Sequence, residues 1–87
     1  MKVVAKPIDV VAWFTRDGSP NPIKFRIVTE DKTELVYKIN KIIKTEKIKL
    51  AGNPTIVFTC QGNVNKTEKL FELRYENLTC KWMLFKI

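Results

Sequence analysis

The amino-acid sequence predicts an all-β protein: a single small antiparallel sheet of about six strands, curved into a barrel or roll, with at most one short helix. Apolar residues recur with a period of two along most of the chain, which is the pattern of half-buried strands. Clusters of Gly, Pro, Asn and Asp separate these runs, as turns do. The chain has 87 residues, so residues 1–87 are expected to form one domain with a thin core.

The first two strands are expected over residues 8–14 and 23–29. Residues 15–22 between them hold one Gly and two Pro, which favour a loop. In the second strand an apolar residue alternates with Lys24 and Arg26, so these two cations face outward. A short polar turn follows, so consecutive strands are expected to be antiparallel neighbours.

The next segment, from Tyr37 to Leu50, leaves two alternatives open. Residues 35–44 fit a strand, while the same apolar spacing loosely fits a helix. β-branched and aromatic residues dominate, and neither an N-cap residue nor an Ala is present, so the strand is favoured. Residues 45–53 are expected to be a connection that contains at most one helical turn.

The last three strands are expected over residues 55–60, 69–75 and 80–87. The first of these runs is apolar or small on both faces, as in a central strand. Residues 61–66 are expected to form a hairpin loop, and residues 76–79 a turn. Closure into a small, Src-homology-3-like barrel would remove exposed strand edges, and a two-layer roll is the alternative.

One core is expected, because each strand has one apolar face. Its expected members are Val10, Phe25, Ile27, Ile39, Phe58, Leu73 and Leu84. Cys60 and Cys80 are expected to be free, buried thiols, since nothing directs the chain to an oxidising compartment. A contact between the two thiols follows if both point into this core.

Composition excludes several kinds of chemistry. The chain has no His, one Ser and two Cys, so a structural zinc site lacks ligands and a Ser or Cys nucleophile lacks an imidazole base. No apolar run approaches the ~20 residues of a membrane span, and the first residues do not fit a secretory signal. We therefore expect a cytoplasmic, non-enzymatic protein with no cofactor, no metal and no membrane association.

Several strand motifs carry a resemblance to known proteins. The chain as a whole resembles a family of small uncharacterised bacterial all-β proteins, through Val11-Ala12-Trp13-Phe14, Asp17-Gly18, Pro22-Ile23-Lys24-Phe25-Arg26, Leu50-Ala51-Gly52-Asn53, Phe71-Glu72-Leu73-Arg74-Tyr75 and Cys80-Lys81-Trp82-Met83-Leu84. More distantly, Phe25-Arg26, Phe71-Glu72-Leu73 and Trp82-x-Leu84 resemble a short β domain that accompanies Y-family DNA polymerases in some bacteria. This second resemblance implies a slight preference for work on DNA and names no active site.

Basic residues form the first candidate site. The net charge is +7, and the densest cluster of cations is Lys38, Lys41, Lys44, Lys47 and Lys49. In a regular strand Lys38 and Lys44 face outward together, while Lys41 points the other way. Such a cluster favours weak, sequence-independent phosphate binding. Solvated strand faces, with Lys as protection against edge-to-edge aggregation, are the alternative.

Trp13 is the second candidate, on an outer face that it would share with Lys24 and Arg26. An exposed Trp beside two cations would stack on an unpaired base, so single-stranded nucleic acid is the expected partner. A minor second core beneath the loop 15–22 is the alternative environment. The same surface, or a sheet edge, could instead dock another protein, which makes a protein–protein adaptor the alternative function.

Overall fold

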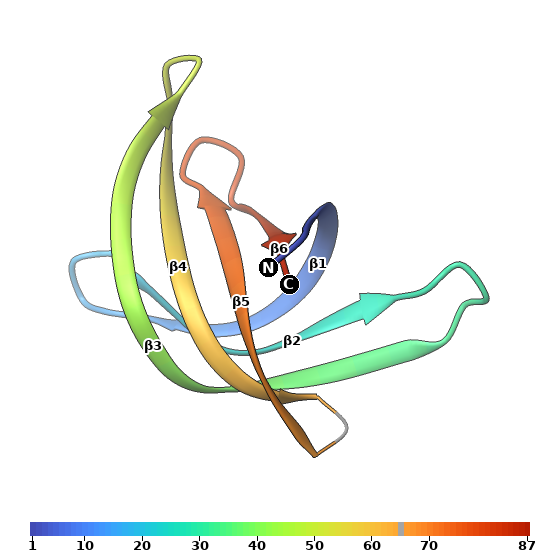
Figure 1. The fold of residues 1–87 in the computed structure, drawn as a ribbon. Helices are drawn as coiled ribbons and strands as arrows, with labels where there is room; N and C mark the ends of the chain where they lie inside the picture. The colour runs from blue at the N-terminus through green and yellow to red at the C-terminus, as the bar shows by residue number, and fades with distance from the viewer. Residues whose placement is uncertain (65) are drawn as a thin grey trace.

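The computed structural model describes residues 1–64 and 66–87, and its strands form a closed antiparallel barrel in chain order (Figure 1). The strands are β1 (Val3–Phe14), β2 (Pro20–Val28), β3 (Glu34–Leu50), β4 (Asn53–Val64), β5 (Thr67–Glu76) and β6 (Lys81–Lys86). Pairing of β1 with β6 closes the barrel. The predicted all-β fold of about six antiparallel strands is confirmed, and the barrel is the form that it takes.

The core fills the barrel. The largest fully buried side chains are Phe25, Phe71, Leu73, Leu84 and Cys60. The rings of Phe25 and Phe71 meet edge to face, with their centroids 5.2 Å apart. Five of the predicted core residues are buried, and Val10 and Ile39 are partly buried against them, so the predicted core is confirmed. Among residues 1–64 and 66–87 there is no helix that is long and apolar enough to cross a membrane.

β3 is much longer than the sequence predicts. It continues through the expected connection to Leu50, where residues 45–50 pair with residues 53–58 of β4. The helical alternative for this segment is therefore wrong. Two β-bulges, at Asn40 and Ile43, interrupt the ladder and with it the period of two. Beyond the second bulge, residues 44–47 are all polar and exposed, so they show no apolar core face, and β4 is the one described strand that pairs with this end of β3.

Other strand limits also differ from the expected ones. β1 begins at Val3 instead of Ile8, and β4 runs on through Gly62 to Val64, into the segment expected to be a loop. Residue 65 of that expected loop lies outside the described residues. Gly62 is therefore a strand residue and not a turn residue. The sequence suggested a loop because Gly and Asn, which favour turns, are adjacent here.

Cys80 lies outside the core, contrary to the prediction. It ends the turn before β6, where it is exposed and has a φ of 58°. The chain turns at this left-handed residue before β6 begins to pair with β1 and β5. The residues of β6 that face the core are therefore Trp82 and Leu84. Cys60 is buried as predicted, and both thiols are free. A contact between the two thiols in the core required both to point inward, and the exposed Cys80 does not meet this condition.

Candidate nucleic-acid interface

The two β-bulges of β3 align three of the predicted lysines. Their partners on β4 are as follows: Lys38 pairs with Asn63, Lys41 with Gln61 and Lys44 with Thr59. These partners are two residues apart along β4, so they and the paired lysines project from one face of the sheet. Each bulge adds one residue to β3 and none to β4. The prediction that Lys41 points away from Lys38 and Lys44 is wrong for this reason.

Lys24 extends this set onto the neighbouring strand, because it lies directly opposite Lys38. In an antiparallel pair the Cβ atoms of opposite residues are roughly 4.5–5.5 Å apart, and two like charges so placed repel each other. An anion bound between the two ammonium groups would relieve this repulsion. We refer to Lys24, Lys38, Lys41 and Lys44, all of them exposed, as the lysine row.

Few carboxylates neutralise the lysine row. Nζ of Lys44 lies 2.5 Å from Oε1 of Glu46, and this hydrogen bond raises the pKa of Lys44. Within the described residues, the ion pairs include none of the other three lysines of the row. Glu68, which lies opposite Asn63, is hydrogen-bonded by the side-chain amide of Gln61. Most of the positive charge of the row therefore faces solvent.

Lys47 and Lys49 lie on the other face of β3. They pair with Ile56 and Pro54, and Ile56 belongs to the core, so Lys47 projects toward the inner side of the sheet. Lys47 lines two cavities there, each of which also includes Ser19. The structure thus separates these two lysines from the lysine row, although all of them come from one sequence cluster.

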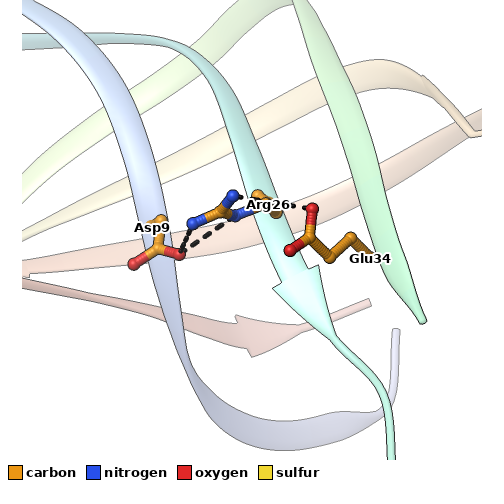
Figure 2. A network of polar contacts seen from close by, with 3 residues as sticks. All are labelled: Asp9, Arg26 and Glu34. Atoms are coloured by element: carbon orange, nitrogen blue, oxygen red, sulfur yellow. Dashed lines mark hydrogen bonds and ion pairs between the residues drawn. The ribbon is translucent and has the colours of Figure 1, made fainter. Parts of the chain in front are cut away.

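Arg26 is held by carboxylates, as Figure 2 shows. Its Nε and Nη2 donate hydrogen bonds of 3.1 and 2.8 Å to Oδ2 of Asp9. Its Nη1 lies 3.6 Å from Oε2 of Glu34. The hydrogen bond from the guanidinium to Asp9 raises the pKa of Arg26. Exposed pairs of this kind contribute little stability, but two acidic partners leave Arg26 poorly placed to bind a phosphate.

Trp13 is 55 % exposed and lies opposite Asn21. Lys24 lies opposite Val11, two residues before Trp13 on β1, so Trp13 and Lys24 share the outer face. Arg26 is further along, opposite Asp9. Trp13 therefore stands at the Lys24 end of the lysine row, and its exposure does not fit a second, minor core.

The polar side chains that border the lysine row were missed in the sequence. Gln61 and Asn63 fall in the segment predicted to be a loop, yet they continue the outward alternation that Thr59 begins. The sequence signal was available, because a polar residue follows each small or buried one from Thr59 to Asn63.

Comparisons of the chain with models of protein families, with curated proteins and with solved structures found no match.

Proposed function

We propose that this protein is a non-enzymatic module that binds single-stranded nucleic acid weakly and without sequence preference, through the lysine row. The observation that carries the proposal is the alignment of Lys38, Lys41 and Lys44 on one face, beside Lys24. An ammonium group is a compact point charge that suits a phosphate, whereas reading of a base edge in the major groove is more often done by Arg.

The row has the dimensions of a linear backbone site. Because the partners on β4 are two residues apart, successive lysines of β3 follow one another at about 7 Å. A strand of nucleic acid laid along β3 would meet one ammonium group after another and release a counterion at each contact. This interaction carries no information about sequence, since phosphates are alike.

Trp13 supports a preference for unpaired bases. It is exposed at the end of the row where Lys24 lies, so a base next to a bound phosphate can stack on the indole. Stacking of this kind needs a base face that a duplex does not offer, and it tolerates every base. Single strands are therefore the expected ligand.

The test is a titration of a fluorescently labelled single-stranded oligonucleotide at several salt concentrations. With four phosphate contacts, the logarithm of the binding constant should fall with the logarithm of salt concentration at a slope of about −3. The double variant Lys38→Glu with Lys41→Glu should bind far more weakly at low salt. Lys47→Glu with Lys49→Glu changes the net charge equally on the opposite face, and it should bind like the wild type.

Three results would count against the proposal. Absence of binding at low salt would remove it, and equal losses in the two double variants would show that only net charge matters. Binding that does not depend on salt concentration would exclude phosphate contacts as its source.

Trp13→Ala should weaken binding to single strands and leave the salt slope unchanged, because the indole contributes stacking and no counterion release.

A further inference from the structure

The edge of β3 is open over most of its length. β2 pairs with β3 only between residues 24–28 and 34–38. From Ile39 to Leu50, β3 pairs with β4 on one side, and no described strand pairs with its other side. Figure 1 shows β3 curving away from β2 toward its hairpin with β4. Such an edge presents unpaired N–H and C=O groups that an added strand can use.

The sequence of β2 keeps this edge open. Where β2 would continue alongside β3, it contains Pro20 and Pro22, which pair with Phe14 and Ala12 of β1. Proline has no N–H to donate, so this part of β2 cannot complete a regular ladder with β3. The chain thus leaves a long strand edge that this neighbouring strand cannot close.

A cavity lies beside the open edge. Its volume is about 300 Å³, and its lining includes Ile42 and Thr45 of β3, Phe58 of β4 and Pro20 of β2. Ile42 and Thr45 project toward the inner side of the sheet, because they pair with the core residues Cys60 and Phe58. In an added strand, every second side chain would point toward this cavity, and the intervening ones toward the outer face.

Charge determines which kind of strand fits. The open segment carries Lys41, Lys44, Lys47 and Lys49 against one acidic residue, Glu46. A second copy of the chain would bring these lysines against the same lysines, and natural proteins use Lys on edges to prevent such pairing. An acidic strand would instead place carboxylates beside Lys41 and Lys44 on the outer face.

From the open edge, the cavity and the charge, we propose that residues Ile39–Leu50 bind an extended acidic segment of another protein by strand addition. In that segment acidic residues alternate with apolar ones: the acidic side chains face Lys41 and Lys44, and the apolar ones enter the cavity. Main-chain hydrogen bonds provide affinity, and the alternate side chains provide specificity. This proposal does not depend on the binding of nucleic acid.

The probe is a labelled peptide in which Val and Glu alternate, about nine residues long so that it spans Lys41 to Lys49. Fluorescence anisotropy measures its binding, and amide chemical shifts locate it. A peptide with Lys in place of Glu should bind at least about tenfold more weakly. Two further peptides carry N-methyl groups on every second residue, in the two possible phases, and leave the protein unchanged. One phase should lose at least about tenfold in affinity, because the edge-facing N–H groups are blocked.

The results separate the proposal from its rivals. Amide shifts concentrated in residues 39–50, with one N-methylated phase weakened and the other not, are expected. Equal binding of both N-methylated phases would overturn strand addition, and equal binding of the basic peptide would overturn the preference for an acidic segment. Concentration-dependent dimers with shifts in the same residues would show that a second copy occupies the edge. Lys47→Glu with Lys49→Glu places carboxylates on the inner side, where Lys47 lines the same cavity. These carboxylates should repel the acidic peptide and weaken its binding, while nucleic-acid binding through the outer face persists, so either proposal can fail alone.

Discussion

Gly62→Ala should destabilise this barrel strongly, because β3 and β4 approach each other at this residue. Gly62 is buried and lies opposite Ile39. A Cβ atom here would lie 2.1 Å from the carbonyl oxygen of Lys38, and 2.9 and 3.0 Å from Cε1 and Cζ of Phe71. Ordinary contacts measure 3.4–4 Å. The carbonyl oxygen must therefore move by more than 1 Å, and the Phe71 ring must be displaced as well.

Displacement of either the Lys38 carbonyl oxygen or the Phe71 ring costs free energy of folding. The oxygen belongs to the backbone of β3, and Phe71 is fully buried in the core. Overpacking of a core typically costs about 1–3 kcal/mol, and the involvement of the backbone places Gly62→Ala near 3 kcal/mol or above. A domain of this size has a total stability of roughly 4–13 kcal/mol. Each kcal/mol lowers the melting temperature by about 4–8 °C, so a decrease of about 12–24 °C is expected.

Thermal unfolding followed by circular dichroism, together with urea titration, measures this effect. Gly52→Ala is the matched control, because no atom lies within 4 Å of its added Cβ and its φ is 82°. The left-handed backbone alone should cost about 1–2 kcal/mol there. If Gly62→Ala melts within a few degrees of the wild type, or above Gly52→Ala, the close approach of β3 to β4 at Lys38 is refuted.

Three further predictions concern the core and the thiols. Phe58→Ala should lower the free energy of unfolding by about 3–5 kcal/mol, because Phe58 is buried and stacks on Trp82 with ring centroids 5.7 Å apart. A loss below about 1 kcal/mol in urea unfolding would contradict its place in the core. Burial raises the pKa of the Cys60 thiol to about 12, so a thiol reagent near neutral pH should label folded protein at the exposed Cys80 alone. Cys80→Ser should therefore abolish labelling. Modification of Cys60 without unfolding would show that this thiol is accessible. Because the pKa of Cys60 in the folded state exceeds its ordinary value of 9.0, its contribution to the free energy of unfolding is complete below that pH and decreases above it by about 1.4 kcal/mol per pH unit, until the pH reaches the folded pKa. Urea unfolding of wild type and Cys60→Ala between these pH values tests the sign, since a constant difference between the two proteins would contradict it.

The sequence by itself determined the fold class and most of the core. Period-two alternation is a local property, so Phe25 and Ile27 could be assigned to an inward face without knowledge of any other strand. The turns between strands were marked by residues that favour them, such as Gly18, which has a φ of 90°. Closure of the strands into a barrel was expected because it reduces the exposed strand edge of so small a β protein, although β3 keeps an open edge from Ile39 to Leu50.

Only the tertiary structure decided which charges lie together. Lys41 joins Lys38 and Lys44 because two bulges shift the register of β3 against β4, and a bulge depends on what the partner strand allows. Arg26 is neutralised by residues 17 positions before it and 8 positions after it, which only the pairing of three strands brings together. Cys80 is exposed because the turn before β6 takes a left-handed residue. Each of these facts depends on strand register, and register is fixed by contacts between residues far apart in the chain.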